Sequence, residues 1–337
     1  MRVGFIGVSH WHAPLYYRPT ARLAGVRIVA VSDGQEAVAE RVGAALGARA
    51  FRDYRDLVLE SRPDFVFAFG RHCDMAEIVR FLIEESVPFM IEKPGGLSFA
   101  EVSELPTLAS RKGVHAGTGF TYRVSDLWQR LAEIITDDEV THASFRYVGG
   151  GPYRYHEVGC PWMLDPRQSG GGPTMNFGIH LIDLYRTLCR REPSQVSAQV
   201  SHETWGLEIE DYSVMVLRAS GSLCTVETGY TFPAESGSFD TRFSLRTRRH
   251  YIVARSDDSL EVRRTWDGAV EHFAVRAAHS PWYPTFAAES IDRVARGRAP
   301  IAGLEDLAAA MRVIDGAYRS AGAGGAPVAL GDDGPHA

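Results

Sequence analysis

The chain has 337 residues, which is enough for two domains or one large one. Apolar residues make up 45% of it and charged residues 23%, so the composition excludes a largely disordered chain. Lys and Arg number 36 against 42 Asp and Glu, which gives a net charge of −6 and excludes the dense basic surface that bulk nucleic-acid binding requires.

The cysteines and the hydropathy of the chain indicate the cellular compartment in which the protein is expected. The four cysteines lie far apart and no pair forms C-x-x-C, so the sequence predicts neither a zinc site nor a redox dithiol. Their scarcity is typical of a reducing cytosol. No apolar run approaches the roughly 18 residues of a membrane helix, and the apolar stretch at the start is too short for a signal peptide. We therefore expect a cytoplasmic protein without a membrane partner.

The first 120 residues alternate between short apolar strands and stretches with helical periodicity. Repeated β-α-β units predict a parallel sheet with helices on both faces. The expected helices include 36–42 and 75–83. The expected strands are Val3–Val8, Val26–Ser32, Asp64–Phe69, Pro88–Ile91 and Val114–Thr118.

The pattern changes near residue 140 to strands in which polar and apolar residues alternate. Alternation predicts an antiparallel sheet with one covered face. Segments 196–201, 212–217 and 251–254 are examples, and helices are expected at Met175–Cys189, Thr285–Arg296 and Leu304–Ala321, followed by a fraying Gly- and Ala-rich tail. The sequence thus predicts an α/β Rossmann-type domain, 1–122, and an α+β domain with a large, mainly antiparallel sheet, 123–337.

The first strand runs into a turn that invites comparison with the dinucleotide-binding pattern G-x-G-x-x-G. Gly7 fits the first glycine, but Ser9 and His12 occupy the other two positions. Alone, this segment is better explained as an ordinary turn that holds two histidines. The cofactor interpretation makes Gly7, Ser9, His10, Trp11 and His12 candidate contacts.

Asp33 ends the second strand, where such folds place an acid on the ribose hydroxyls. Gly34 follows it and no Arg is adjacent in sequence, which favours NAD over NADP; a turn or helix-capping role for Asp33 is the alternative. His10 and His12 have no neighbouring carboxylate or Cys partner, so no metal site is predicted here.

Two later segments carry candidate chemistry. Lys93 follows the strand Pro88–Ile91 within Glu92-Lys93-Pro94, at the edge of a parallel sheet where ligands bind. Farther on, a glycine loop leads into a predicted helix on which Asn176, His180 and Asp183 are spaced four and three apart and share one face. Each segment also has a purely structural explanation. Glu92 and Lys93 could form a charge pair in a surface turn, and His180 could be a core histidine bonded to Asp183.

Together these segments resemble the Gfo/Idh/MocA family of oxidoreductases. The resemblance rests on VGFIGVSHWH, on E-K-P at 92–94, on GGG…GIHLID and on the closing Glu305-Asp306…Ala317-Tyr318-Arg319-Ser320, which occur in the family's order along nearly the whole chain. It implies a Rossmann domain, a second domain with an open antiparallel sheet, and NAD or NADP as cofactor. It also implies that Lys93 lies near the nicotinamide and that His180 exchanges the proton.

The chain departs from the family pattern at three places. Asn176 stands where the family commonly has Asp; an amide can bind a substrate hydroxyl but cannot take its proton. Two glycines of the first loop are missing. After the fourth strand the family often has A-T-P-x-x-x-H, whereas this chain has Ala68-Phe69-Gly70-Arg71-His72, so Phe69, Gly70 and His72 are candidate groove residues.

The expected reaction is hydride transfer between a nicotinamide and a secondary alcohol or ketone of a sugar, inositol or related polyol. Neutral His180 would serve as base, and the Lys93 cation would stabilise the developing alkoxide. Asn176, Tyr122 and Arg123 would bind further substrate hydroxyls. Asp183, which shares a helix face with Asn176 and His180, is a further candidate substrate contact. Trp162 would stack on a sugar face, or else pack in the core.

Two other functions remain open at this point. One is glycoside cleavage through transient oxidation by bound NAD, which would use the same residues. The other is a non-catalytic protein that senses a sugar or nucleotide with an eroded cofactor loop. In each case the expected partner is a small molecule, and we expect a homodimer or homotetramer formed through the C-terminal sheet.

Overall fold

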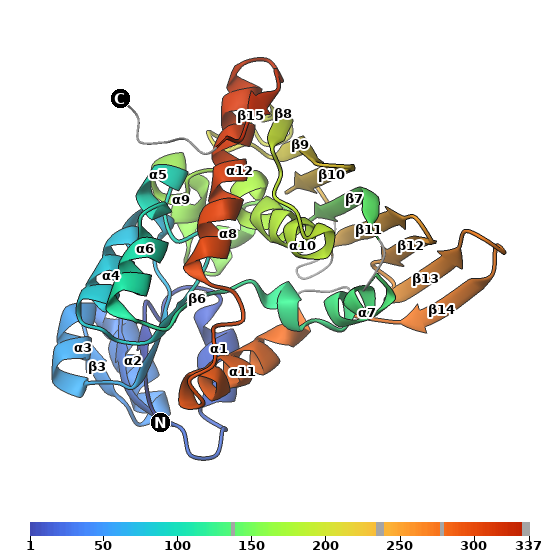
Figure 1. The fold of residues 1–337 in the computed structure, drawn as a ribbon. Coiled ribbons are helices and arrows are strands. Elements are labelled where there is room, and N and C mark those ends of the chain that lie inside the picture. The colour runs from blue at the N-terminus through green and yellow to red at the C-terminus, as the bar shows by residue number, and fades with distance from the viewer. Residues whose placement is uncertain (136–138, 234–238, 277–279, 332–337) are drawn as a thin grey trace. The chain divides into compact units, whose positions relative to one another are not determined.

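A computed structural model describes residues 1–135, 139–233, 239–276 and 280–331 (Figure 1). By their contacts these residues form two compact units. The first comprises Met1–Thr121, Tyr155–Gly170 and Pro281–Ala308. The second holds the other described residues. The predicted domains, 1–122 and 123–337, are each continuous, whereas two segments that follow residue 122 belong to the first unit.

The first unit is built on a parallel sheet that has, among the described residues, six strands in the order β3-β2-β1-β4-β5-β6. This order confirms the predicted Rossmann-type sheet. The central strands are apolar and fully buried, as strands covered on both faces should be. The strands are β1 (Arg2–Ile6), β2 (Arg27–Ser32), β3 (Arg49–Phe51), β4 (Phe65–Ala68), β5 (Phe89–Ile91) and β6 (Ala116–Thr118).

Helices connect these strands in the order that the β-α-β pattern predicts. Both helices named from the sequence are present and longer than expected, whereas α1, α3, α5, α6 and the short β3 were not predicted individually. The described helices of this unit are α1 (Ala13–Thr20), α2 (Glu36–Leu46), α3 (Tyr54–Ser61), α4 (His72–Glu84), α5 (Phe99–Val102), α6 (Leu105–Lys112), α9 (Pro166–Ser169) and α11 (Tyr283–Ala295).

The second unit contains a sheet of nine described strands in the order β14-β13-β12-β11-β7-β10-β9-β8-β15. Only β7 and β10, among these described pairs, run parallel, which confirms the predicted open, mainly antiparallel sheet. The strands are β7 (Val140–Val148), β8 (Gln195–Ser201), β9 (Tyr212–Ala219), β10 (Ser222–Gly229), β11 (Asp240–Thr247), β12 (His250–Arg255), β13 (Ser259–Arg264), β14 (Val270–Ala274) and β15 (Val328–Ala329).

One face of this sheet is covered and the other is open. Along β9, buried residues alternate with exposed ones such as Val214 and Val216. The helix α10 (Ile179–Cys189) packs on β7 and β10, and a π-helical turn, Thr174–Gly178, leads into it. The remaining helices are α7 (Asp126–Ile134), α8 (Arg154–Glu157) and α12 (Leu304–Gly322), with the unit boundaries falling inside α8 and α12.

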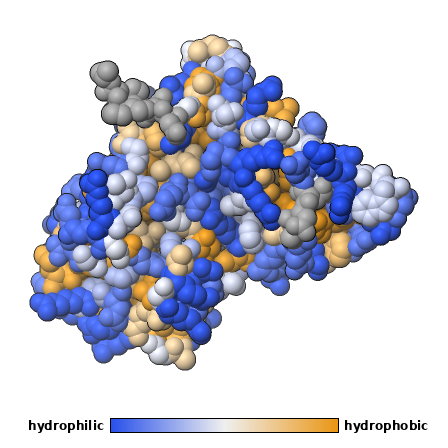
Figure 2. Space-filling view, viewed as in Figure 1, coloured by the Kyte–Doolittle hydropathy of each residue, from blue (hydrophilic) through white to orange (hydrophobic). Residues whose placement is uncertain are grey.

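In the part of the chain that the structure describes, no helix has both the length and the apolar character needed to cross a membrane. Hydrophilic residues dominate the face seen in Figure 2, and hydrophobic residues appear between them. The predicted tail extends into 332–337, which lie outside the described residues.

Candidate functional site

The turn after β1 begins at Gly7, whose φ is +71°. A Cβ atom here would lie 1.6 Å from the carbonyl oxygen of Phe69, so only glycine fits. The Gly7 amide donates to the carbonyl oxygen of Ser32 at 2.8 Å, which ties the turn to the end of β2. The first glycine of the sequence pattern therefore has the tight-turn role expected of it.

Ser9 and Asp33 face each other at the carboxyl edge of the sheet. The Ser9 amide donates to Oδ2 of Asp33 at 2.7 Å, and the Gln35 amide donates to Oδ1 at 2.9 Å. Asp33 is 5% exposed. The carboxylate thus orders the turn after β1 as well as the start of the segment after β2.

A cavity of about 750 Å³ opens along this edge. Its lining brings together five of the predicted cofactor residues, and Trp162, which was predicted on the substrate side, lines it too. The acid at the end of β2, the glycine turn and the cavity suit the adenosine end of a dinucleotide. The residues concerned are Gly7, Ser9, Asp33, Phe69, Gly70 and Trp162.

Three histidines, the buried His10 and His72 and the 14% exposed His12, lie beside this turn in the first unit. Burial is the largest cause that lowers the pKa of each, and for His72 the value falls to about 3. Nδ1 of His72 lies 2.7 Å from the carbonyl oxygen of Ser169, while the His10 ring stacks on Trp11 with centroids 4.0 Å apart. The three rings are therefore neutral at pH 7. Among the described residues, no group of three or more His, Cys, Asp or Glu is arranged to hold a metal ion.

His12, at the third glycine position, joins the turn to the segment after β5. Its Nδ1 lies 3.2 Å from Oε2 of Glu92, and its Nε2 lies 3.2 Å from the hydroxyl of Tyr283 on α11. Lys93 follows Glu92 and is 2% exposed. Burial lowers the pKa of Lys93 to about 8, although the Glu92 carboxylate opposes the shift.

In the second unit, His180 begins the first turn of α10 and is 5% exposed. The ring of Tyr122 meets it edge-on with centroids 6.2 Å apart and packs on Phe243 as well. Burial raises the pKa of Tyr122, so its hydroxyl keeps its proton. Two predicted site residues are therefore neighbours in this unit.

Asn176 lies in the π-helical turn before α10, and its Nδ2 donates to the hydroxyl of Tyr230 at 3.0 Å. Arg154 lies over the Tyr230 ring, 4.8 Å from its centroid. Tyr230 follows the end of β10 and was not predicted; an aromatic residue after a strand is too common a signal to single it out.

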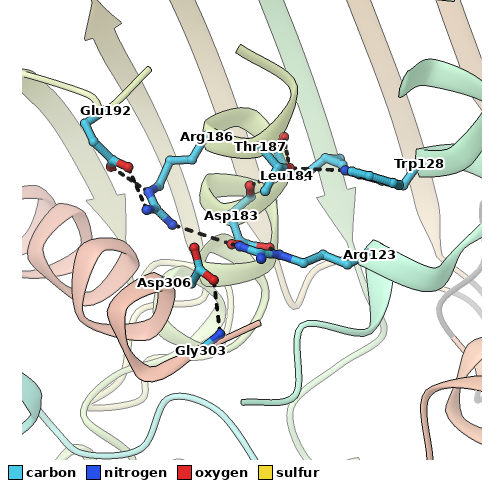
Figure 3. Close-up of polar contacts among 9 residues, drawn as sticks. All are labelled: Arg123, Trp128, Asp183, Leu184, Arg186, Thr187, Glu192, Gly303 and Asp306. Carbon is cyan, nitrogen blue, oxygen red and sulfur yellow. Dashed lines mark hydrogen bonds and ion pairs between the residues drawn. The ribbon is translucent and has the colours of Figure 1, made fainter. Parts of the chain in front are cut away.

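Asp183 lies between two arginines (Figure 3). Arg123 donates to it at 2.6 and 2.9 Å, and Arg186, one turn along α10, lies 3.5 Å away and also pairs with Glu192 at 2.6 Å. Asp183 is 1% exposed. This network fastens α10 to the turn before α7, which is a structural role for two residues that the sequence placed on the substrate side.

The glycine loop before α10 is held by Glu210, which the sequence analysis also missed. Its carboxylate accepts hydrogen bonds from the amides of Gly172 and Thr174 and from the Tyr318 hydroxyl, at 2.8 to 3.0 Å. Gly171 has a φ of +150°, so this segment needs glycine. A buried acid with three donors explains why the loop can keep one shape.

A 3-2-1-4-5-6 parallel sheet with a glycine turn facing an acid at the end of β2 is typical of dinucleotide-binding domains, and here a buried lysine follows β5. The chain belongs to the Gfo/Idh/MocA family. Residues 1–120 match the model described as an oxidoreductase family with an NAD-binding Rossmann fold, and residues 128–253 match the model of a GFO/IDH/MocA C-terminal domain. It is an NAD-binding oxidoreductase.

Known proteins similar to this chain agree with the family. D-xylose 1-dehydrogenase (NADP(+)) 2 of Haloferax volcanii is 26% identical over 324 residues, covering 91% of this chain and 94% of that protein. An oxidoreductase from Agrobacterium radiobacter, solved with NAD+, L-tartaric acid and magnesium, has a TM-score of 0.86 at 18% identity and 98% coverage of both chains. An inositol dehydrogenase homologue from Azotobacter vinelandii, solved with NAD+, has a TM-score of 0.85 at 16% identity, covering 98% of this chain and 97% of that one.

Proposed function

We propose that this protein transfers a hydride between NAD and a secondary alcohol or ketone of a sugar, an inositol or a related polyol. The observation that carries the proposal is Lys93, a buried lysine directly after a parallel strand, with its pKa lowered to about 8. Perturbed, buried cations at such an edge are typical of catalytic sites. Two similar proteins, a D-xylose 1-dehydrogenase and an inositol dehydrogenase homologue, support the same substrate class.

Lys93 is proposed to stabilise the substrate oxygen. Oxidation of an alcohol removes a hydride from carbon and a proton from oxygen, and negative charge builds on that oxygen as the proton leaves. A buried ammonium stabilises this charge more strongly than an exposed one, because less water screens it. When bound, the nicotinamide supplies the acceptor for the hydride.

His180 is proposed to take the proton in the oxidative direction and to return it in the reductive one. A neutral imidazole is the suitable base at pH 7 because its ordinary pKa lies near that value. We propose that Asn176 and Tyr122 bind further substrate hydroxyls. Substrate contacts of Arg123, Asp183 and Trp162 stay predictions.

The cofactor is proposed to contact the turn after β1 and the acid after β2. Gly7, Ser9 and Asp33 line the cavity, as do Phe69 and Gly70. The nearby His10, Trp11, His12, His72 and Glu92 are proposed to shape the same groove.

We also propose a cytoplasmic homodimer or homotetramer formed through the second sheet. Val214, Val216 and Tyr251 lie on its open face and are 37%, 38% and 42% exposed, and apolar side chains on an open sheet face are candidates for burial against a second copy. Light scattering after gel filtration measures the assembly, and replacing Val214 and Val216 with Lys should reduce it to monomers.

The activity is tested by incubating the purified protein with NAD+ or NADP+ and a panel of polyols that includes D-xylose and myo-inositol. Absorbance at 340 nm follows reduction of the cofactor. Turnover of at least one polyol, lost in Lys93→Met, is expected. If the protein binds neither NADH nor NADPH in a fluorescence titration, the proposed function is wrong.

A further inference from the structure

The end of β3 lies beside the end of β2, where the ribose-binding acid is found. The two strands run parallel with Ser32 opposite Phe51, and the Asp33 amide donates to the carbonyl oxygen of Phe51 at 3.1 Å. Arg52 directly follows Phe51, the last residue of β3. Arg52 therefore leaves the sheet next to Asp33, although 19 positions separate them in sequence, and it lines the same cavity.

Arg52 differs from the other arginines of this cavity. Arg55 forms an ion pair with Glu77, and Arg71 donates to both oxygens of Asp74 at 2.7 and 2.9 Å. Within the described ranges Arg52 has no hydrogen-bond or ion-pair partner. A cation that faces a cavity without a carboxylate of its own is available to an anionic ligand.

The surroundings of Asp33 leave room for such an anion. Both carboxylate oxygens already accept backbone amides, from Ser9 and Gln35, which hold the carboxylate in place at the end of β2. Gly34 follows, and an added Cβ there would meet nothing within 4 Å. The end of β2 therefore opens into a cavity that Arg52 lines together with Asp33, Asp53 and Asp56. The other two carboxylates of the lining, Asp74 and Glu77, are paired with Arg71 and Arg55.

We infer that Arg52 binds the 2′-phosphate of NADP, so that this chain accepts NADP as well as NAD. The inference rests on the proposed function, since it concerns the same cofactor cavity. Asp33 and Asp56 also line that cavity, and their charge keeps the unphosphorylated ribose acceptable. Cofactor choice is thus set by Asp33 after β2 and Arg52 after β3. Arg52 contributes only to the binding of NADP, because NAD lacks the 2′-phosphate.

The test compares NADH and NADPH binding by nicotinamide fluorescence, with no substrate present. The wild-type protein should bind both, with Kd values within about tenfold. Arg52→Ala should weaken NADPH about 10- to 100-fold, the range of hydrogen bonds to a charged group, and change NADH less than about twofold. Arg52→Glu should abolish NADPH binding and retain NADH. Competition by 2′,5′-ADP against 5′-ADP should show the same selectivity without the nicotinamide.

Arg49 supplies the matched control. It lies at the opposite end of β3, pairs with Glu60 at 2.6 Å and is outside the cavity, so Arg49→Ala should leave both affinities unchanged. Binding of NADH but not NADPH would overturn the inference and leave the proposed function intact. Equal weakening of both cofactors by Arg52→Ala, at an unchanged melting temperature, would overturn it as well. Binding of neither cofactor would overturn the proposed function itself.

Discussion

Buried charges have two different roles in this protein. Asp183 has two arginines within 3.5 Å, and Arg123 holds both of its oxygens. Lys93 is equally buried, but the desolvation is strong enough to lower its pKa to about 8, which means that its charge is only partly compensated. A compensated charge stabilises a structure, whereas a partly compensated one is available for chemistry.

Replacing Lys93 with Met should reduce turnover by about 10²- to 10³-fold, because the developing negative charge loses its cation. Met has a similar length and is apolar, so the melting temperature should not fall. NADH fluorescence should still report cofactor binding. A fully active Lys93→Met variant would remove Lys93 from the mechanism.

The pH dependence of kcat/KM should reflect the titration of the Lys93 ammonium group. Since burial lowers the pKa of Lys93 from its usual value to about 8, the folded protein loses this charge as the pH rises through about 8, well before a surface lysine would. We therefore expect kcat/KM for alcohol oxidation to fall above about pH 8 in a profile measured from pH 6 to 10. A profile that stays level to pH 10 would show that the charge is not needed.

Asp183→Ala should destabilise the protein by about 3–5 kcal/mol, because it removes a buried carboxylate and leaves Arg123, only 14% exposed, without it. The exposed pair of Asp292 on α11 and Arg296 just after it is the control, since water screens this pair and Asp292→Ala should cost far less than Asp183→Ala. Urea unfolding measures both. Equal costs would mean that the network of Figure 3 contributes no more than a surface pair.

At the scale of elements, the sequence predicted the long buried strands better than the short or proline-containing elements. The apolar strands β1, β2, β4, β5 and β6 were predicted because buried parallel strands are nearly uniform in character. The helix α1 was missed because Pro14 and Pro19 lie in it, although a proline at the start of a helix is well tolerated. β3 was missed because three residues, all at least partly exposed, are too few to show a strand pattern, and the position of Arg52 was missed with it.

The turn after β1 depends on one backbone conformation. Gly7→Ala should abolish NADH binding and destabilise the protein, because a Cβ atom would collide with the Phe69 carbonyl oxygen and the φ of +71° is strained for alanine. Gly34→Ala, in the same cavity but with open space around it, should have little effect on the melting temperature. Comparable losses in both variants would contradict this account of the turn.

At the scale of the whole molecule, the first unit is discontinuous. Tyr16 on α1 is fully buried, and its ring packs on Tyr283 and Phe286 of α11 with centroids 5.1 and 6.3 Å apart. The segment 155–170 also returns to this unit and supplies Trp162 and Ser169 to His72. A domain boundary inferred from sequence alone follows the order of the chain, so it separates these segments from the unit they complete.

A fragment of residues 1–122 should therefore lack a cooperative thermal transition, because it exposes the aromatic surface around Tyr16. The same fragment joined through flexible linkers to 155–170 and 281–308 should regain one. Circular dichroism melting curves compare the two. A fragment 1–122 that melts as sharply as the extended one would show that the returning segments are dispensable.

The sequence by itself determined the two kinds of sheet, the position of Lys93 after a parallel strand, and the positions of Gly7 and Asp33 after the first two strands. These features depend on short-range periodicity and on motifs a few residues long. Tertiary structure alone decided that Asp183 is held by Arg123, that Asn176 meets Tyr230, and that Arg52 stands beside Asp33. Each of these depends on strand register and on contacts between residues distant in sequence, which local patterns do not encode.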